Sequence, residues 1–143
     1  EINQAHPDVR AVISVNKGLV TQASAAIPVV PLYFAILYKV MKKAGNHENC
    51  IQQIARLFTQ KLYTPEGFQT DENGFIRMDD YELMPEIQEE VKKCWKAVTT
   101  DTVKEYCDID GYWEDFYHMF GFRYEDIDYT QDIEAEVEID GIV

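Results

Sequence analysis

The sequence is poor in cysteine, and its few cysteines follow no pairing pattern. Its 143 residues contain three of them, Cys50, Cys94 and Cys107, with no C-x-x-C spacing. Small secreted domains that depend on disulfides carry even numbers of cysteines at close spacings. The count therefore argues against a disulfide framework and favours a reducing compartment, so we expect a cytoplasmic protein.

Positive charge is also scarce. The chain has 13 Lys and Arg residues against 26 Asp and Glu residues, a formal net charge of −13. Nucleic-acid binding needs a cationic surface that displaces counterions from phosphates. We therefore expect no DNA or RNA partner.

Long hydrophobic runs are missing too. The longest, residues 25–38, has 14 residues and contains Pro28 and Pro31, whereas a membrane-spanning helix needs about 20 apolar residues. The N-terminus is polar and shows no secretory signal. We expect no membrane partner.

What the sequence does contain fits one globular unit with an uneven charge. Hydrophobic residues make up 46% and charged residues 27% of the chain, a balance typical of a folded domain with its own core. Residues 1–63 carry seven basic and three acidic side chains, or +4, and residues 64–143 carry six and 23, or −17. No Pro-, Gly- or Ser-rich linker separates the two parts. We interpret them as one contiguous structure whose acidic part is by default a solvated surface.

Periodicity and turn residues predict one core strand, a short extended segment and five helices. The β-branched run at residues 9–15 predicts a buried strand, and residues 75–78 follow a turn as an extended segment. Helices are predicted over residues 31–43, 47–62, 85–98, 101–106 and 112–120. The first is apolar nearly all round, and the second is amphipathic, with Ile51, Ile54, Leu57 and Phe58 on its apolar stripe. Two prolines rule out a regular helix before Pro31, and the acidic tail, residues 124–143, is expected to be irregular.

The turn after the predicted strand is the first candidate binding element. A strand, a glycine turn at Gly18–Thr21 and a buried helix can present backbone amides and hydroxyls to a dinucleotide. An ordinary strand-to-helix loop has the same pattern. The turn alone therefore leaves the choice between a cofactor site and a plain connection open.

Other chemical motifs are weaker. Tyr33 and Tyr38 stand nine and four residues before Lys42, as in dehydrogenases whose lysine lowers the pKa of a catalytic tyrosine. Because all three lie in an apolar helix, we interpret this spacing as coincidence. His47 and Cys50 are only two of the four ligands that a structural zinc site needs, and no second pair follows, so we expect no zinc site. Asp108–Gly111 is better explained as a turn than as a calcium loop.

The long segment SVNKGLVTQASAAIPVVPLYFAILYKVMKKAGNHENCIQQIARLF, residues 14–58, closely resembles the trans-2-enoyl-CoA reductase and FabV-type enoyl-ACP reductase family. The likeness continues through IRMDDYELMPEIQEEV at residues 76–91 and through residues 111–122. It is weakest over residues 1–8 and the acidic tail. The resemblance therefore covers almost the whole chain.

The resemblance implies an α/β fold, the C-terminal part of a Rossmann-like parallel-sheet domain related to the short-chain dehydrogenases. The portion present here is expected to be mostly α-helical, with one core strand. Family members reduce trans-2-enoyl thioesters with NADH in fatty acid metabolism, with hydride going to the β-carbon. Their catalytic Tyr-x8-Lys pair precedes the region present here, so this chain has no catalytic residue of its own and is expected to be inactive alone.

The same resemblance assigns residues within the chain. Leu19, Val20 and Thr21 match the segment that contacts the cofactor, by backbone to the nicotinamide amide and by the Thr hydroxyl to the phosphates or the amide. The helix after it matches the wall of the acyl pocket, which suggests Phe34, Leu37 and Tyr38 as substrate-pocket residues. Packing in the core is the competing role for each of these three. No metal site is implied.

The implied organisation is a single reductase domain. Residues 1–22 are its last core strand and cofactor turn, residues 23–63 its substrate-pocket segment and residues 64–143 an acidic helical region. Its partners are an enoyl-CoA or enoyl-ACP substrate and the N-terminal part of the same monomeric enzyme, without which the strand at residues 9–15 should lack partners on both sides. The alternative is a non-catalytic acidic helical interaction module, with the aromatic helix 112–120 docking a partner.

Overall fold

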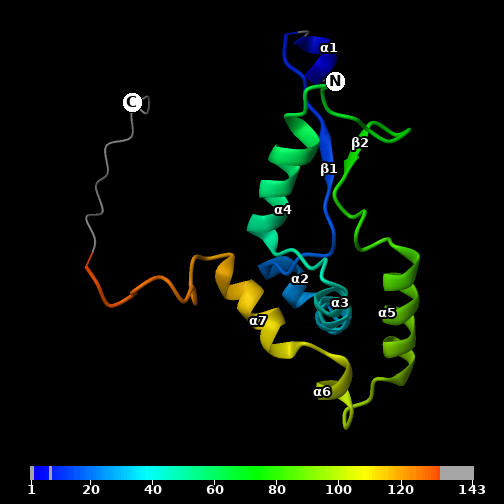
Figure 1. The fold of residues 1–143 in the computed structure, drawn as a ribbon, viewed down its shortest axis with the longest axis vertical. Coiled ribbons are helices and arrows are strands. Elements are labelled where there is room, and N and C mark those ends of the chain that lie inside the picture. Colours follow the sequence, from blue (N-terminus) through cyan, green and yellow to red (C-terminus); the bar gives the residue numbers. More distant parts are fainter. Residues whose placement is uncertain (1, 7, 133–143) are drawn as a thin grey trace.

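Helices predominate in the computed structural model, which describes residues 2–6 and 8–132 (Figure 1). None of the described helices is long and apolar enough to cross a membrane. Helices around a small parallel sheet are consistent with a portion of an α/β domain. In chain order the elements are α1 (Ile2–Ala5), β1 (Ile13–Val15), α2 (Gln22–Ala26), α3 (Val30–Ala44), α4 (Cys50–Arg56), the π-helix η1 (Leu57–Leu62), β2 (Phe75–Arg77), α5 (Pro85–Ala97), α6 (Val103–Tyr106) and α7 (Ile109–His118).

The sheet consists of two parallel strands, β1 and β2. Ile13 pairs with Phe75 and Val15 with Arg77, and the long crossover that parallel strands require contains α2, α3 and α4. The observed strand is shorter than the predicted one. The expectation that this strand lacks partners on both sides is wrong for one side, because β2 of the acidic part pairs with it. On its other edge β1 has no strand within the described part of the chain, and Ile13 is 60% exposed.

Helix α3 forms the centre of the core and confirms the predicted helix over residues 31–43. Its apolar side chains are buried nearly all round, and it packs against α5 and α7. Pro31 lies in the first turn, where a missing N–H breaks no helical hydrogen bond. Gly45 ends the helix with a left-handed φ of 77°, a conformation that glycine adopts without a side-chain clash.

A short helix lies directly before α3, in the segment where the prolines predicted none. Helix α2 has only five residues and ends at Ala26, so it fits between the turn and Pro28. Its first turn is capped by Thr21, whose side chain accepts from the backbone N–H of Ser24. Proline excludes a helix that continues through it, but it does not exclude one that stops before it.

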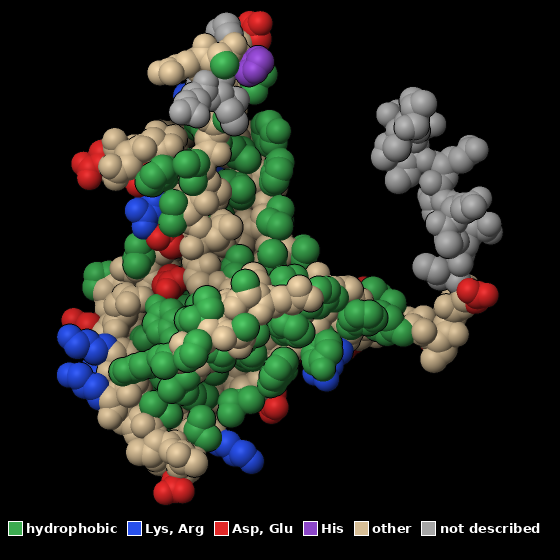
Figure 2. Space-filling view, turned by 180° about the vertical axis from the view of Figure 1, so that it is seen from behind, with side chains coloured by type: hydrophobic (Ala, Val, Ile, Leu, Met, Phe, Trp, Pro, Cys, Tyr) green, Lys and Arg blue, Asp and Glu red, His purple; other side chains and the backbone are tan. Residues whose placement is uncertain are grey.

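The predicted helix over residues 47–62 forms as α4 and η1, but it faces the opposite way from the prediction. Ile51, Ile54 and Phe58 of the apolar stripe are 54%, 47% and 46% exposed, whereas Gln53 and Arg56 are buried. In Figure 1, α4 lies beside β1 in the upper part of the molecule. The same part, seen from behind in Figure 2, shows hydrophobic side chains along its edge. This surface is apolar and about half exposed, and Phe58 on it contacts the Tyr63 ring, with the ring centres 5.8 Å apart.

Arg56 explains the orientation of α4. Its guanidinium donates to Glu48 at 2.7 Å, to Asp80 at 2.9 and 3.1 Å and to the Met78 carbonyl at 2.9 Å, and it lies 4.2 Å from the centre of the Tyr81 ring. A buried cation is tolerated only when it is paired in this way. Contacts with the segment after β2 therefore decide which face of the helix points inward.

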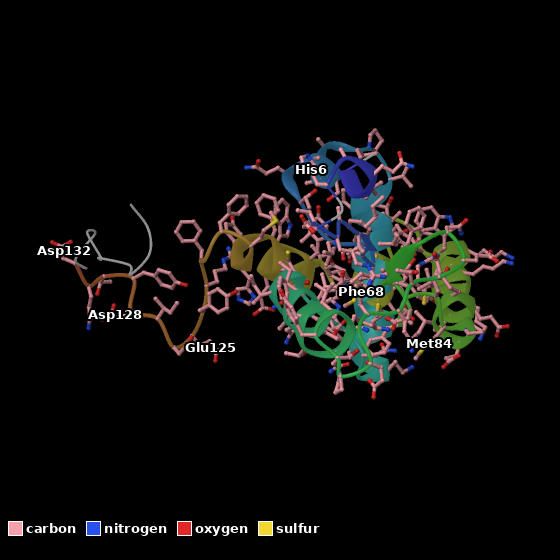
Figure 3. All side chains as sticks on the ribbon, turned by 90° about the horizontal axis from the view of Figure 1, so that it is seen from above. His6, Phe68, Met84, Glu125, Asp128 and Asp132 are labelled. Atoms are coloured by element: carbon pink, nitrogen blue, oxygen red, sulfur yellow. The ribbon has the colours of Figure 1, made fainter. Side chains whose placement is uncertain are left out.

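Helices α5, α6 and α7 confirm that the acidic part contains three helices, but α7 begins at Ile109, so the break predicted at residues 110–111 is wrong. Ile87 and Val91 of α5 and Tyr112 of α7 are buried against α3. After α7 the chain leaves the body, so that Glu125, Asp128 and Asp132 lie apart from the packed helices (Figures 1 and 3). Residues 124–132 contain turns without helix or strand, as predicted; the rest of the predicted irregular tail, residues 133–143, lies outside the described residues.

Candidate functional site

The candidate site is the turn of residues 16–21, which we call the β1 turn. It leaves the carboxyl end of β1 and leads into α2 and α3 (Figure 1). In open α/β sheets, ligands bind in the crevice outside the carboxyl ends of the strands. The β1 turn therefore occupies the position where a cofactor would be expected.

Two amides of the β1 turn donate to side chains far away in the sequence. The Gly18 amide donates to Glu82 Oε2 at 2.5 Å, and the Val20 amide donates to the Tyr38 hydroxyl at 3.0 Å. Gly18 is also close to α3, because a Cβ added to it would lie 2.5 Å from Phe34 Cε1. The turn is thus held against α3 and against the segment before α5.

Thr21 and Ser24 form a reciprocal cap at the start of α2. The Thr21 amide donates to Ser24 Oγ at 2.7 Å, and Thr21 Oγ1 accepts from the Ser24 amide at 3.0 Å. The Thr21 hydroxyl also donates to Ser24 Oγ at 3.1 Å. With its hydrogen engaged, the Thr21 oxygen retains the capacity to accept a further hydrogen bond.

Two backbone groups between the Gly18 amide and the Thr21 amide remain open. Within the described residues, the Leu19 N–H has no acceptor and the Val20 carbonyl has no donor. The other groups from the Gly18 amide to the Thr21 amide have partners, since the Gly18 carbonyl accepts from Lys17 Nζ and the Leu19 carbonyl accepts from Ser24 Oγ, both at 3.3 Å. An open donor and an open acceptor one residue apart match a carboxamide, which offers one C=O and one NH₂ group.

Lys17, at the start of the turn, is a buried lysine with 3% of its surface exposed. Its ammonium nitrogen lies 4.6 Å from the centre of the Tyr38 ring, a cation–π contact. Burial lowers the pKa of Lys17 from 10.5 to about 8, although the carboxylates of Asp115, Glu82 and Glu48 raise it. Burial likewise raises the pKa of the Tyr38 hydroxyl well above its ordinary value.

The three predicted substrate-pocket residues lie in the core of α3. Leu37 and Tyr38 are completely buried and Phe34 is 8% exposed. Tyr38 stacks with Phe34, with the ring centres 6.1 Å apart, and meets His47 edge-on at 4.5 Å. In this structure they pack the wall behind the β1 turn, and their contact with a substrate stays a prediction.

The tyrosine–lysine spacings bring no catalytic pair together, in agreement with their interpretation as coincidence. The Tyr33 hydroxyl donates to Glu82 Oε1 at 2.6 Å. Lys42 instead pairs with Asp108 at 2.8 Å. Burial would raise the pKa of Asp108, but hydrogen bonds from Lys42 and the Gly111 amide hold it below its ordinary value.

The motifs that suggested metal binding have structural roles. His47 Nε2 lies 3.0 Å from Asp115 Oδ2, and the described residues contain no group of three or more His, Cys, Asp or Glu side chains able to hold a metal ion. Asp108 caps α7, with its carboxylate accepting from the Gly111 amide at 3.0 Å. The segment predicted as a turn is therefore the start of a helix, with Asp108 as its cap and residues 109–111 in its first turn.

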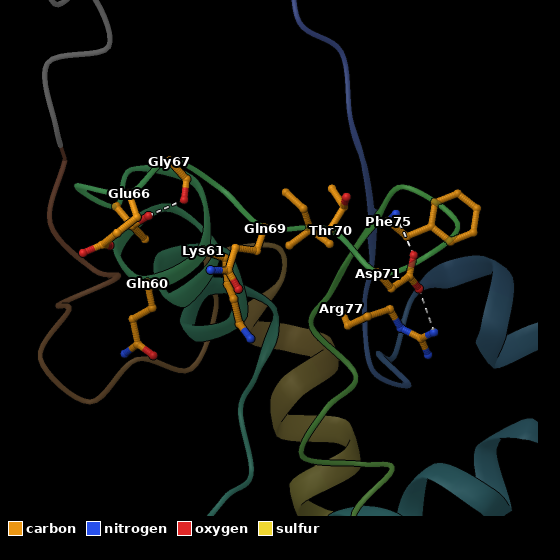
Figure 4. Close-up of a pocket in the computed structure, with 11 residues that line it drawn as sticks. Gln60, Lys61, Glu66, Gly67, Gln69, Thr70, Asp71, Phe75 and Arg77 are labelled. Carbon is orange, nitrogen blue, oxygen red and sulfur yellow. Dashed lines mark hydrogen bonds and ion pairs between the residues drawn. The ribbon is translucent and has the colours of Figure 1, made fainter.

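A polar pocket lies away from the β1 turn, near the start of β2 (Figure 4). Its volume is about 380 Å³, and Lys61, Asp71 and Arg77 line it. Lys61 pairs with Asp80 at 2.9 Å and Arg77 with Asp71 at 3.4 Å. Because these charges are already paired and none of the predicted site residues lines the pocket, it does not belong to the candidate site.

Sequence reasoning missed Glu82 and Ser24 as neighbours of the turn. Glu82 lies 64 residues from Gly18, so no local pattern connects the two. Ser24 could have been found, because a Thr followed three residues later by a small polar residue is typical of a helix start.

Two family models match the chain. The trans-2-enoyl-CoA reductase catalytic region matches residues 1–63, and the enoyl reductase FAD-binding domain matches residues 70–133. Together the two regions leave only a short junction and the C-terminal end unmatched. The boundary between them coincides with the change from the basic to the acidic part.

The described residues of the second region do not fit an FAD. Residues 70–133 contain 18 acidic and six basic side chains, whereas a dinucleotide brings negatively charged phosphates. The helix starts that could receive phosphates carry carboxylates instead, Glu86 at α5 and Asp108 with Asp110 at α7. Among residues 70–132, which the structure describes, these charges therefore do not support an FAD site.

Relatives are about half identical over nearly the whole chain. An enoyl-[acyl-carrier-protein] reductase [NADH] of Flavobacterium psychrophilum is 48% identical over 134 residues, which are 94% of this chain and 34% of the relative. A trans-2-enoyl-CoA reductase [NADH] of Ruminiclostridium cellulolyticum is 48% identical over 93% of this chain and 33% of the relative. The chain thus spans about a third of the length of the curated relatives it matches.

Solved structures give the same match. The trans-2-enoyl-CoA reductase of Clostridium acetobutulicum in complex with NADH is 48% identical over 93% of this chain and 34% of that chain, with a TM-score of 0.80. The Treponema denticola enzyme in complex with NAD is 47% identical over 92% and 33%, with a TM-score of 0.81. In sequence and in fold, the chain belongs to the trans-2-enoyl-CoA reductase and enoyl-ACP reductase family.

Proposed function

We propose that this chain is the C-terminal part of an NADH-dependent reductase that reduces the C2–C3 double bond of trans-2-enoyl thioesters. The observation that carries the proposal is the open Leu19 N–H and Val20 C=O at the carboxyl end of β1. Relatives about half identical to the chain are named as NADH-dependent enoyl reductases. The open pair gives this chain a physical means of holding the same cofactor.

The proposed roles within the chain are binding and orientation. The Leu19 N–H donates to the carboxamide oxygen of the nicotinamide, and the Val20 carbonyl accepts from its NH₂ group. The Thr21 oxygen is a further acceptor beside them. When bound, NADH supplies the hydride that reduces the β-carbon. The catalytic tyrosine and lysine come from the preceding part of the polypeptide.

The proposed fold of the whole enzyme is a Rossmann-like parallel sheet. The free edge of β1 is where an upstream strand of that sheet pairs, because a buried parallel strand needs neighbours on both sides. Residues 1–22 then supply the strand and cofactor turn, residues 23–63 the substrate-pocket segment and residues 64–143 the acidic cover. We expect a monomeric cytoplasmic enzyme that takes an enoyl-CoA or an enoyl-ACP.

The experiment that tests this function uses the intact reductase. Thr21→Val is expected to lower turnover of NADH with crotonyl-CoA by orders of magnitude, because it removes the proposed acceptor at the carboxamide. Thr21→Ser is the matched control, since it removes only the methyl group and keeps the hydroxyl that caps α2. A near-normal rate for Thr21→Val, or an equal loss in both variants, would remove Thr21 from the site.

The substrate-pocket segment is tested through chain-length preference. We expect that trimming Phe34 or Leu37 changes the relative rates with short and long enoyl thioesters more than it changes the affinity for NADH. Phe34 is the better probe, because its side chain lies directly against Gly18 of the turn. Equal effects on all acyl lengths would show that Phe34 and Leu37 pack in the core and do not contact the acyl chain.

A second function is favoured by the exposed aromatic side chains in and after α7. Trp113, Phe120 and Phe122 are 45%, 44% and 55% exposed, as a surface that docks a partner would be. This is the alternative of a non-catalytic acidic interaction module. The intact mass of the protein separates the two, because the reductase requires a polypeptide far heavier than the 16.6 kDa of this chain.

A further inference from the structure

Glu82 is a buried carboxylate that reaches the β1 turn from the acidic part of the chain. Only 9% of the residue is exposed. One carboxylate oxygen accepts from the Gly18 amide at 2.5 Å and the other from the Tyr33 hydroxyl at 2.6 Å. The Glu82 carbonyl accepts from Gln88 Nε2 at 2.8 Å, which fixes the backbone behind the carboxylate. Each of these groups lies on a different segment.

Glu82 makes no ion pair with a described residue, which is unusual for a buried carboxylate. Burial of such a group is expensive unless hydrogen bonds satisfy its oxygens. The two donors provide that satisfaction, and burial together with the bond to Glu82 raises the pKa of Tyr33 to about 12. The Tyr33 hydroxyl therefore remains a donor at neutral pH.

Three backbone amides of the β1 turn are each held by a side chain, which we call an anchor. Glu82 holds the Gly18 amide, Tyr38 holds the Val20 amide and Ser24 holds the Thr21 amide. Among these anchors, Glu82 alone comes from the acidic part of the chain. Without its anchor, the peptide that precedes the open Leu19 N–H would be free to rotate.

We propose that Glu82 is a positioning residue for the cofactor, which holds the Gly18 amide so that the Leu19 N–H and the Val20 carbonyl stay in the arrangement that a carboxamide requires. The proposal rests on the proposed NADH-dependent function. It gives the acidic part a role in cofactor binding that needs no FAD and no contact between Glu82 and NADH.

The experiment compares three variants of the intact reductase. Glu82→Leu removes both acceptors, and Glu82→Gln keeps an oxygen for the Gly18 amide while its NH₂ group can donate to the Tyr33 oxygen. Glu86→Leu is the control, because it changes an exposed carboxylate four residues further along the chain, in the first turn of α5. We expect the NADH dissociation constant to rise about tenfold in Glu82→Leu and to stay within about twofold of wild type in Glu82→Gln and Glu86→Leu.

The measurements are NADH titration by fluorescence, the KM for crotonyl-CoA and hydrogen exchange of residues 16–21 without cofactor. We expect Glu82→Leu to speed exchange of this segment and to leave the KM for crotonyl-CoA unchanged. Equal NADH affinity in Glu82→Leu and wild type, equal exchange in both, or an equal loss in Glu82→Gln would overturn the positioning role. A wild-type enzyme that does not bind NADH would instead overturn the proposed function. The exchange experiment would then still test whether Glu82 holds the β1 turn.

A further variant keeps the proposal testable if Glu82→Leu does not fold. Tyr33→Phe removes one hydrogen bond to the carboxylate and leaves the Gly18 bond in place. We expect it to raise the NADH dissociation constant about threefold, because the carboxylate loses one of the two groups that orient it. An unchanged NADH dissociation constant in Tyr33→Phe would contradict the positioning role of Glu82.

Discussion

The basic first part and the acidic second part of the chain differ in charge, yet they are bound to each other. Residues 1–63 carry +4 and residues 64–143 carry −17. Most of the cationic side chains of the first part meet oxygens of the second. The ion pairs between the two parts are Lys42–Asp108, Arg56–Asp80 and Lys61–Asp80. The two parts are also joined by the His47–Asp115 hydrogen bond and by Lys39, which donates to the carbonyls of Lys104 and Glu105.

The difference shows that the acidic part is more than a solvated surface. Burial would raise the pKa of Asp80, but hydrogen bonds from Arg56 and Lys61 hold it below its ordinary value. Strand β2 pairs with β1, and α5 and α7 cover α3. The second part therefore completes the core and the sheet of the first, while its surplus of negative charge stays on the surface.

The largest expected effect comes from breaking the buried contact between the two parts. Arg56→Leu should lower the free energy of unfolding by about 3–5 kcal/mol, because it leaves Glu48 and Asp80 without their buried cation. Urea denaturation of the intact protein measures this change. A loss below about 1 kcal/mol would show that the contacts of Arg56 contribute little to holding the two parts together.

Lys17 gives a pH-dependent test of how the turn is buried. Its pKa of about 8 in the folded protein lies below 10.5, so the unfolded chain binds more protons between these pH values and stability rises with pH. Relative to Lys17→Met, the wild type should gain up to about 3 kcal/mol from pH 8 to 10.5. The pKa of Lys17 also depends on the negative charges around it, which raise it: Asp115, Glu82, Glu48 and Cys50. A constant difference between the two unfolding curves would mean that Lys17 is solvated.

Gly18→Ala tests the contact between the turn and α3. The new Cβ would lie 2.5 Å from Phe34 Cε1, and overpacking of this kind costs about 1–3 kcal/mol of unfolding free energy. Phe34→Leu in the same protein should recover part of the loss, because it makes room for the methyl group. Additive effects in this double-mutant cycle would indicate that the two residues do not touch.

The smallest effect is expected at an ion pair within the acidic part. Lys93 and Glu90 are 3.2 Å apart, with side chains 71% and 44% exposed. Lys93→Ala should change the free energy of unfolding by less than about 1 kcal/mol, since solvent and salt screen exposed pairs. It is the control for Arg56→Leu, and a comparable loss in both would contradict the distinction between buried and exposed pairs.

Local signals in the sequence predicted most helices correctly. Pro31 and Gly45 mark the start and end of α3, and Pro85 marks the start of α5, because each of these residues has a conformational preference that acts on its immediate neighbours. The orientation of α4 could not be predicted in this way. Its apolar stripe predicted an inward face, but the ion pairs of Arg56 turn the opposite face inward.

The candidate site was predictable only in part. Leu19, Val20 and Thr21 follow from the resemblance to the reductase family, and the structure adds which of their backbone groups are open. The anchors Glu82 and Tyr38 lie 64 and 18 residues from the amides they hold. Hydrogen bonds over such separations leave no periodic trace in the sequence.

The sequence by itself determined the family, the charge contrast between the two parts and the places where the main helices begin and end. Those properties depend on residue identity and on interactions between near neighbours. Only the tertiary structure decided that β2 pairs with β1, that Arg56 turns inward and that Glu82 holds Gly18. Each of these joins residues distant in the chain, and a buried polar group is stable only where folding brings its partner to it.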